Sequence, residues 1–491
     1  MNTDKLSLIV CIVIACVLFS ATAVLLYAEY RLGDDTYIYL RYVRNILEHK
    51  ELSFNPGDPQ YGVTSILWLL ALVGVSKVSP DLLSSPAILS FSISLILVGT
   101  LIYLVKRKCD SVRYLLPISV ILAIEPNVLR HSFLGMEAPL SALLLLLVIG
   151  ARMQERNNHR FPWSALLSSL MVLNRPETIL IIPFLLIDKM IWRETKAQMI
   201  VWISIFTLPA ALGMMYMVSH TGSFLPVTIQ AKGGGAIGDH VVLHLFDLAI
   251  IIGSVYLPWI ALFALEAWVL RGRSRSVVMA VVKEYYLWFL PALIISLAYI
   301  LFLSNERIYS RYMMMVMLPF VIGTIKVSQH LSPSRLRSAG PIVTLVLLYS
   351  VLVSSLLAPA TVKNNRDIEL SKDVLISWIQ SNTLSSDIIA CGMIGKIGYV
   401  TDRRIVCTMG IVNPDIRKYR EEGRIREYYK MKNVHYSVGV GKNDSDVDWL
   451  LAEGISGRCE ASFQLPSRSL IREIIGEIQG KSYFIVAKVQ Q

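Results

Sequence analysis

Charged side chains are scarce in this chain. Asp, Glu, Lys and Arg make up only 17% of its 491 residues, whereas 54% are hydrophobic. Globular domains carry about a quarter charged residues. Apolar runs of membrane-spanning length recur from residue 6 to about residue 358. Because hydrocarbon offers the backbone no hydrogen-bond partner outside its own helix, this composition excludes a large water-soluble enzyme and predicts a polytopic α-helical membrane protein.

Cysteine is also scarce, and its spacing matches no metal site. The six cysteines lie in the first apolar run, in a basic loop and near the C-terminus: Cys11, Cys16, Cys109, Cys391, Cys407 and Cys459. Three cysteines in one terminal segment leave at least one unpaired, so the sequence implies no disulfide framework. No internal repeat stands out along the chain.

The net charge of +11 could suggest a nucleic-acid partner, but the distribution of the charge argues against one. Lys and Arg lie mostly in short runs between apolar segments, where they set the orientation of a membrane protein. The runs at 106–108, 152–156, 189–196, 271–275 and 335–337 all fall on one side of the predicted membrane. The positive-inside rule makes that side cytoplasmic. We therefore expect a multi-pass protein of the plasma membrane with a cytoplasmic N-terminus and no nucleic-acid partner.

About eleven segments are predicted to span the membrane. They are 6–28, 84–105, 112–127, 136–151, 162–174, 176–192, 197–218, 242–270, 284–303, 311–327 and 340–358. The first is expected to be a retained span, because its apolar part is longer than a signal-peptide core and no cleavage site is clear. The pair around Pro176 forms either a helical hairpin or one helix broken at the proline. The apolar segment 63–79 is at the lower limit for crossing, and we expect it to lie at the interface or to re-enter without crossing.

From about residue 361 the composition becomes that of a soluble domain. A helix-like segment at 367–380 is followed by strand-like segments at 386–392, 403–410, 435–441 and 482–490. This pattern predicts a transmembrane domain over 1–360 and an exterior α/β domain over 361–491.

Two adjacent carboxylates, Asp34 and Asp35, follow the first span directly, with Arg31 and Arg41 close to them in the sequence. Carboxylates at a membrane surface are partly desolvated. Such a pair could supply a general base for a substrate hydroxyl or hold a divalent cation. It could equally cap the helix that follows. The pair alone does not decide between these possibilities.

The surrounding stretch, GDDTYIYLRYVRNILEHKELSFNPGDPQYGVTSILW, resembles the first exterior loop of a family of GT-C glycosyltransferases. These are multi-span enzymes that use polyprenyl-phosphate-linked sugars, and mycobacterial cell-wall arabinofuranosyltransferases are among the relatives. The family pattern is roughly GDDAYI-x-x-RYA-x-N-L, then FNPGE, then EGYT-x-x-LW. This chain departs from it at Thr36, Asp58 and Gln60.

Further segments resemble the family in the expected order. They are 135–138 (GMEA), 174–177 (NRPE), 224–232 (FLPVTIQAK, with Val227 in place of Asn), 310–312 with 318–319, and 392–399 (GMIGKIGY). All five are exterior in the topology that the basic runs predict. The resemblance therefore covers most of the chain and implies the GT-C fold.

The resemblance also implies roles for individual residues. Asp34 is the expected general base, Asp35 its orienting partner, and Glu137 a second carboxylate that orients the acceptor. Asp34 and Asp35 could together hold Mg, Mn or Ca, although no cofactor is certain. Exterior cations are expected to bind the donor phosphate, namely Lys232, Arg311, Arg175 and Arg307. Other substrate contacts are expected from Arg41, Tyr61, Thr64, Glu177 and His131.

The expected function is an inverting glycosyl transfer on the exterior face of the membrane. The donor would be a polyprenyl-phosphate sugar, and the acceptor a glycan, a glycolipid or a protein. A transporter or flippase of lipid-linked sugars is the main alternative, since it would share the spans and the basic exterior pockets. A transporter would more often show internal repeats and charges lining a path through the membrane. A non-catalytic scaffold is a third possibility, against which the intact Asp34-Asp35 pair argues.

Overall fold

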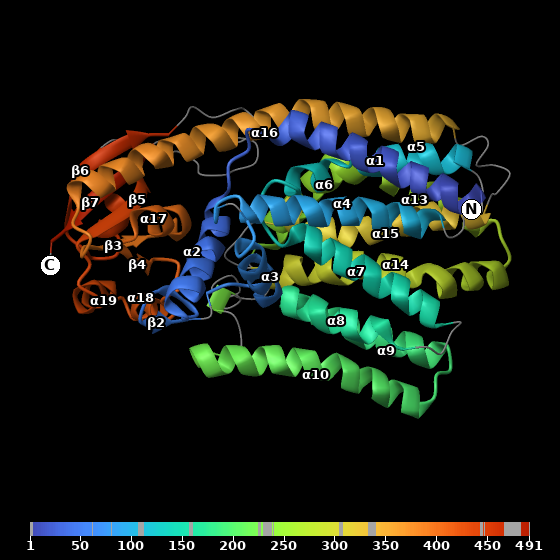
Figure 1. The fold of residues 1–491 in the computed structure, drawn as a ribbon, viewed down its shortest axis with the longest axis horizontal. Helices are drawn as coiled ribbons and strands as arrows, with labels where there is room; N and C mark the ends of the chain where they lie inside the picture. The colour runs from blue at the N-terminus through green and yellow to red at the C-terminus, as the bar shows by residue number, and fades with distance from the viewer. Residues whose placement is uncertain are drawn as a thin grey trace.

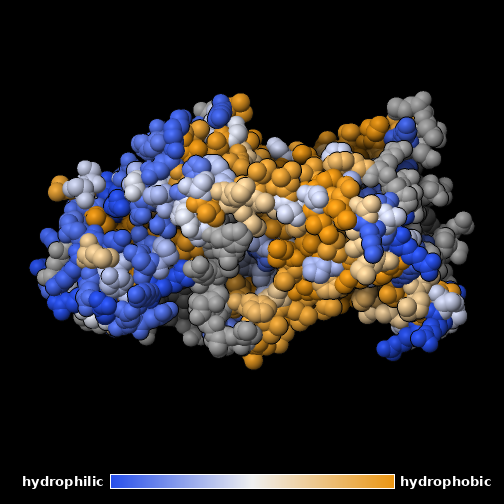
Figure 2. Space-filling model, turned by 90° about the horizontal axis from the view of Figure 1, so that it is seen from below, coloured by the Kyte–Doolittle hydropathy of each residue, from blue (hydrophilic) through white to orange (hydrophobic). Residues whose placement is uncertain are grey.

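The protein is an elongated molecule in which a bundle of long helices carries a small sheet domain at one end (Figure 1). The computed structural model describes residues 3–60, 62–79, 81–106, 112–156, 161–223, 227–228, 238, 240–303, 308–331, 340–441, 445, 447–465 and 483–490. We call the end of the bundle that faces the sheet domain the domain end, and the other the opposite end. The surface of the bundle is a broad apolar band, whereas the sheet domain is mostly polar (Figure 2).

Each of the eleven predicted spans contains a helix of the bundle. Its helices are α1 (Thr3–Tyr27), α4 (Ser85–Lys106), α5 (Val112–Ala123), α7 (Ala138–Glu155), α8 (Trp163–Asn174), α9 (Ile182–Ile191), α10 (Lys196–Thr221), α12 (Val241–Ile251), α13 (Leu257–Arg271), α14 (Arg275–Phe302), α15 (Ser310–Leu331) and the first part of α16 (Gly340–Asn382). The π-helical turn η2 (Ile252–Tyr256) joins α12 to α13. The short helix α6 (Pro126–His131) lies at the domain end.

Seven helical stretches in the described part of the chain are long and apolar enough to cross a membrane. They are those of α1, α4, α7, α10, α14 and α15, together with the continuous stretch from α12 to α13. The chain is therefore a multi-pass membrane protein. The predicted count of eleven is supported only in part, because α5, α8 and α9 have 12, 12 and 10 residues and are short for a full crossing.

The segments on either side of Pro176 form a helical hairpin, which is one of the two predicted arrangements. The Asn174 amide donates to Ser141 near the start of α7, while Ser164 at the start of α8 donates to Glu155 at the end of α7. Helix α8 therefore runs antiparallel to α7. The chain then turns through the 3-10 helix η1 (Pro176–Ile181), and α9 returns to the opposite end.

A second short apolar helix, α3 (Ile66–Ser76), covers most of the predicted segment 63–79. Its 11 residues extend over roughly 16 Å, about half the thickness of the hydrocarbon core. The Ser65 hydroxyl caps it by accepting from the Trp68 amide. The helix is too short to span, in agreement with the predicted non-crossing segment.

The sheet domain is built on five strands in the order β4-β3-β5-β7-β6. Its strands are β3 (Ile388–Cys391), β4 (Arg404–Cys407), β5 (Tyr436–Gly441), β6 (Gly457–Gln464) and β7 (Tyr483–Val489). The first three pair in parallel, whereas β7 runs antiparallel to both β5 and β6. The domain also contains α17 (Ile394–Thr401), α18 (Ile416–Glu421), α19 (Ile425–Met431) and α20 (Asp448–Leu451). Sequence patterning predicted each strand except β6.

The sheet domain is joined to the bundle by one continuous helix. Helix α16 has 43 residues and runs from the bundle into the sheet domain (Figure 1). The predicted domain boundary at residue 360 falls inside this helix. The membrane part and the sheet domain are therefore joined by a continuous helix, which contains Pro359 at this boundary.

The segment after α1 lies between the bundle and the sheet domain. It contains α2 (Asp34–His49) and the small hairpin of β1 (Ser53–Asn55) and β2 (Asp58–Pro59). Helix α2 begins after Gly33 and places its two acidic residues in the first turn, where a helix favours negative charge. The contacts of α2 position the candidate site.

Candidate functional site

A cavity of about 640 Å³ opens at the domain end of the bundle. Residues from α2, the loop before α3, the segment before α7, η1, α14, α15 and the sheet domain line it. Its polar lining residues are Asp35, Tyr39, Thr64, Glu137, Arg175, Glu177, Thr228, Tyr299, Arg311 and Tyr312. The structure thus brings together predicted site residues from segments far apart in the sequence.

Arg175 joins the carboxylates of Glu137 and Glu177 in one wall of the cavity. Its guanidinium donates to Glu137 Oε1 at 2.8 Å, to Glu177 Oε1 at 2.7 Å and to the Tyr299 hydroxyl at 2.9 Å. The Tyr299 hydroxyl in turn donates to Glu177 at 2.6 Å. The extended backbone of Arg175 between α8 and η1 directs the side chain inward. Every nitrogen of this guanidinium is engaged, so Arg175 serves first to hold the two carboxylates.

Glu137 keeps one unsatisfied oxygen. Glu137 is only 3% exposed, and its Oε2 has no hydrogen-bond partner within the described part of the chain. An isolated buried carboxylate oxygen is costly. Glu137 lines the cavity, and this oxygen is itself buried in the cavity wall.

Asp35 faces Arg311 across the cavity. Arg311 Nη1 donates to Asp35 Oδ2 at 2.6 Å. The guanidinium carbon lies 5.4 Å from the ring centre of Tyr309 and 5.1 Å from that of Tyr312, within the range of a cation–π contact. The Asp35 side chain is 47% exposed, whereas that of Arg311 is 15% exposed. The Arg311 guanidinium is therefore fixed in position by its neighbours, whereas the Asp35 carboxylate is accessible to a substrate.

Asp34 points away from the cavity, toward the sheet domain. Its Oδ2 accepts from the Gly395 amide at 2.9 Å and its Oδ1 from the Lys396 amide at 3.1 Å. The Lys372 ammonium of α16 lies 4.0 Å from Oδ1. Burial raises the pKa of the Asp34 carboxyl above its ordinary value, while Lys372 and the two amides act in the opposite direction. Asp34 is not among the described residues that line the cavity.

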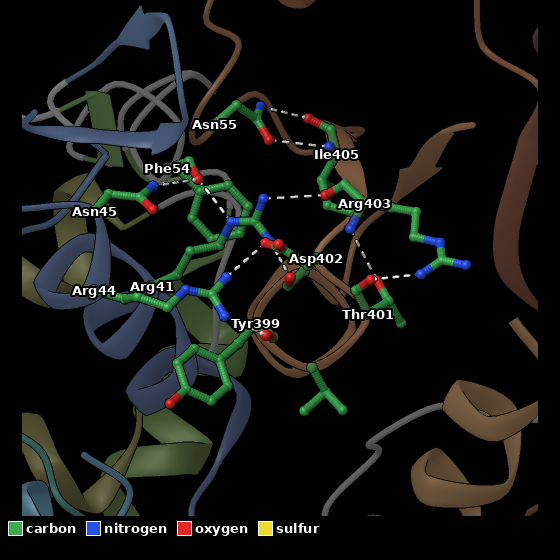
Figure 3. A network of polar contacts seen from close by, with 12 residues as sticks. Arg41, Arg44, Asn45, Phe54, Asn55, Tyr399, Thr401, Asp402, Arg403 and Ile405 are labelled. Carbon is green, nitrogen blue, oxygen red and sulfur yellow. Dashed lines mark hydrogen bonds and ion pairs between the residues drawn. The ribbon is translucent and has the colours of Figure 1, made fainter. Parts of the chain in front are cut away.

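Arg41 also lies on the sheet-domain side of α2, although it was predicted to contact substrate. It is 1% exposed, and its guanidinium donates to the carbonyls of Phe54 at 2.7 Å, Arg403 at 3.1 Å and Gly398 (Figure 3). Burial lowers its pKa to about 10. Beside it, the Asn55 side chain donates to and accepts from the backbone of Ile405. The structure places Arg41 in a contact between protein elements rather than in the cavity.

The remaining predicted site residues have different positions. The hydroxyls of Thr64 and Thr228 lie 3.1 Å apart in the cavity wall. His131 is buried outside the lining, where its Nε2 lies 3.2 Å from Ser310 Oγ. Burial, reinforced by Arg130 and Arg311, lowers the pKa of His131 well below its ordinary value. Three further predicted residues lie outside the described part of the chain: Tyr61, Lys232 and Arg307.

Several residues of the site were not predicted. Tyr299 and Tyr312 contribute aromatic rings to the cavity, and Ile411 of the sheet domain also lines it. Tyr312 and Lys396 lie within quoted motifs, but the motifs did not indicate their contacts. Lys372 and Tyr299 lie in helical segments without a motif, so the sequence carries no signal for them.

The expected divalent-cation site is not supported by the donor arrangement. Within the described part of the chain, no group of three or more His, Cys, Asp or Glu residues could hold a metal ion. Asp35 faces a guanidinium, and Asp34 faces backbone amides and an ammonium group. Calcium and magnesium need several oxygen ligands converging on one point, which this pair does not provide.

No protein-family model matches the chain, and no curated protein matches it either. Several solved structures, however, are similar to it. ArnT from Cupriavidus metallidurans in the apo state has a TM-score of 0.63 at 11% identity over 97% of both chains. The same protein bound to undecaprenyl phosphate has a TM-score of 0.62 at 11% identity, over 99% of this chain and 98% of that one.

The oligosaccharyltransferase of Archaeoglobus fulgidus, in a complex with Zn and sulfate, is also similar. Its TM-score is 0.55 at 12% identity, over 88% of this chain and 68% of that one. ArnT and this oligosaccharyltransferase are both members of the GT-C superfamily. The likeness runs over nearly the whole of this chain, including the sheet domain. The chain therefore has the GT-C fold.

Proposed function

We propose that this protein is a membrane glycosyltransferase. It moves a sugar from a polyprenyl-phosphate donor to an acceptor hydroxyl at the domain end of the bundle, which the basic runs predict to be the exterior. The observation that carries the proposal is the cavity in which Asp35 and Glu137 face the cations Arg311 and Arg175. A structure of the same fold bound to undecaprenyl phosphate supports a lipid-linked donor.

The wall formed by η1 and α14 suits the lipid part of the donor. Leu180, Ala298, Phe302 and Leu303 line the cavity there. Leu180 and Phe302 are 40% and 57% exposed on the outside of the bundle, where a membrane would cover them. An isoprenoid chain can lie along this wall while its phosphate remains at the polar rim. The lipid then enters sideways from the bilayer.

Arg311 is the proposed cation for the donor phosphate. It lies in the cavity and is oriented by two aromatic rings. A guanidinium can give two parallel hydrogen bonds to a phosphate, and it stabilises the charge that develops as the phosphate departs. Binding of the phosphate to Arg311 releases Asp35 from its ion pair. The resting pair thus keeps both groups charged and in place until the donor arrives.

Asp35 is the proposed general base, in place of the Asp34 expected from the resemblance. The acceptor oxygen attacks the anomeric carbon from the side opposite the phosphate. As the new carbon–oxygen bond forms, the bond to the phosphate oxygen breaks, and its electron pair leaves with the phosphate. Asp35 takes the proton of the acceptor hydroxyl. Asp35 lies in the cavity wall and is exposed, whereas Asp34 is bound to the amides of α17.

Glu137 is the proposed acceptor of a hydrogen bond from a sugar hydroxyl. Its Oε1 is held by Arg175, which fixes the carboxylate, and its Oε2 has no partner within the described residues. A site that contains an unsatisfied buried acceptor discriminates against ligands that lack the matching donor. Glu137 therefore contributes to the choice of sugar or acceptor.

The proposal is tested with purified protein in lipid nanodiscs. Wild type and Asp35→Asn are incubated with a panel of polyprenyl-phosphate sugars, and donor consumption is measured with and without glycan, glycolipid and peptide acceptors. Glu48→Gln, an exposed change at the far end of α2, is the matched control. We expect turnover by wild type and control and almost none by Asp35→Asn. Donor binding without consumption under any condition would contradict the proposal and favour transport of lipid-linked sugars.

A further inference from the structure

Helices α2 and α17 lie side by side and run in the same direction. Asp34, at the start of α2, binds the amides of Gly395 and Lys396 at the start of α17. About two turns later on α2, Arg41 donates to the Gly398 carbonyl, and nearly one turn beyond it Arg44 donates to the Tyr399 carbonyl at 3.1 Å. The same face of α2 therefore contacts both ends of α17.

These contacts match the charge distribution of a helix. The first amides of a helix carry partial positive charge, and its last carbonyls carry partial negative charge. Asp34 is placed at the first, and the guanidinium groups of Arg41 and Arg44 at the second. Arg44 also donates to Asp402, just beyond the end of α17, at 2.8 Å. The charged residues of α2 thus fix both the direction and the position of α17 along it.

Two glycines of the GMIGKIGY segment make the close contact possible. A Cβ on Gly395 would collide with the Asp34 carbonyl oxygen, and one on Gly398 would lie 2.8 Å from the Phe54 ring. The first clash is with backbone and requires α2 or α17 to shift, whereas the second requires at least the Phe54 ring to shift. The glycines therefore mark the surface of α17 on which α2 and β1 lie.

We propose that Asp34 is a positioning residue that fixes the first turn of α2 on the sheet domain and thereby directs Asp35 into the cavity. This inference rests on the proposed function, because it assigns Asp34 a role in the same reaction. Successive helical residues point about 100° apart, so Asp34 and Asp35 necessarily face different neighbours. The sheet domain is then part of the catalytic unit rather than an appended module.

The position of Asp35 is sensitive to this contact. Asp35 reaches Arg311 on α15, whereas Asp34 is held by α17 and lies beside Lys372 on α16. The first turn of α2 is thus fixed from two sides. A shift of about 1 Å in a reacting group can lower a rate about 100-fold. Loosening the Asp34 contact should therefore slow the reaction without removing any group that touches substrate.

The role of Asp34 can be separated from that of a base by a second variant that leaves every carboxylate in place. Gly395→Ala forces α17 away from Asp34, because the added Cβ meets the Asp34 backbone. Gly392→Ala is the matched control, since its Cβ would lie 3.4 Å from the nearest atom, Thr408 Oγ1, an ordinary contact. Asp34→Asn completes the set.

Two readouts are made on the full-length protein in nanodiscs. We expect Asp34→Asn and Gly395→Ala each to lower kcat about 10- to 100-fold with little change in KM for the donor, and the double variant to be little worse than either. Gly392→Ala should behave as wild type. A loss above about 1,000-fold for Asp34→Asn, with Gly395→Ala unaffected, would overturn the proposal and make Asp34 the base.

Amide hydrogen exchange over residues 394–401 tests the contact without any substrate. Both Asp34→Asn and Gly395→Ala should accelerate exchange in this segment, whereas Gly392→Ala should not. Unchanged exchange in Asp34→Asn would overturn the proposal, even in a protein that turns over normally. If wild type consumes no donor at all, the proposed function fails, while the exchange rates still decide whether Asp34 holds α17.

Discussion

The two faces of α2 differ in how completely their polar groups are satisfied. On the face toward the sheet domain, Asp34 and Arg41 bind backbone amides and carbonyls, and Arg41 is almost fully buried. On the face toward the bundle, Asp35 is half exposed and lines a cavity together with Tyr39. One face is closed and the other is open. Adjacent residues of one motif can therefore have separate functions.

This difference follows from what each face contacts. Backbone amides and carbonyls at helix ends need partners, and side chains from α2 supply them for α17. The groups that surround the cavity are instead side chains paired with one another, such as Asp35 with Arg311 and Glu137 with Arg175. Such pairs can exchange a partner for a ligand without unfolding a helix. We therefore assign stability and orientation to the closed face and, under the proposed function, chemistry to the open one.

The largest effect is expected on the open face. Asp35→Asn removes the proposed base and should lower kcat about 1,000-fold, within the usual range for loss of general base catalysis. Thermal unfolding should be nearly unchanged, because the side chain is half exposed. The rate of donor consumption in a single turnover measures the effect. Activity within a few-fold of wild type would show that the two faces are not divided as described.

A smaller effect is expected from the cation opposite Asp35. Arg311→Lys keeps the charge but loses the planar pair of hydrogen bonds, and should reduce kcat/KM for the donor about 100-fold. Arg420→Lys on the sheet-domain surface is the control, since Arg420 pairs only with exposed Glu453 among its described ion pairs. The measurement is the donor dependence of the initial rate. Equal losses in the two variants would contradict a role for Arg311 at the donor phosphate.

On the closed face, the expected loss is one of stability. Arg41→Ala removes one donor from each of the carbonyls of Phe54, Gly398 and Arg403. The first two still accept from the Asn45 side chain and the Asp402 amide, so the loss should destabilise the protein by about 2 kcal/mol. Denaturation in detergent, followed by the fluorescence of the sheet domain and by proteolysis of residues 394–401, measures it. A variant as stable as wild type would mean that these contacts do not hold α2.

The effect of Asp34→Asn on stability is expected to be smaller than that of Arg41→Ala. Burial raises the pKa of Asp34 in the folded protein, so the folded state binds this proton more tightly than the unfolded chain. The contribution of this group to stability is therefore greatest at low pH and declines as the pH rises through the raised value. A neutral Asn mimics the protonated form, so the melting temperature should change by only about 3 °C or less. A large fall at neutral pH would show that the charge itself stabilises the fold.

Much of the architecture could be predicted from the sequence, because it depends on local patterns. Long apolar runs gave the helices of the bundle, and alternating residues gave four of the five strands of the sheet. The length of an apolar segment was a weaker guide to whether it crosses the membrane. The short helices α8 and α9, for example, form a hairpin. Strand β6 (Gly457–Gln464) was missed because it lacks a strongly apolar face.

The site could be predicted only in part. The basic runs placed Asp35, Glu137, Arg175 and Arg311 at one end of the molecule, and the structure gathers them around one cavity. Their orientation could not be predicted, because it depends on contacts between residues more than 300 positions apart, such as Asp34 with Gly395. The specific likeness to arabinofuranosyltransferases and the sidedness of the membrane stay predictions.

The comparison of Asp34→Asn with Asp35→Asn in one assay tests the account most directly. Both variants are loaded with the same polyprenyl-phosphate sugar, and the rate of donor consumption is measured in a single turnover. The account predicts that Asp34→Asn retains about 1 to 10% of the wild-type rate and Asp35→Asn about 0.1%. The reverse order, with Asp35→Asn the more active variant, would contradict the division of α2 into a positioning face and a catalytic face.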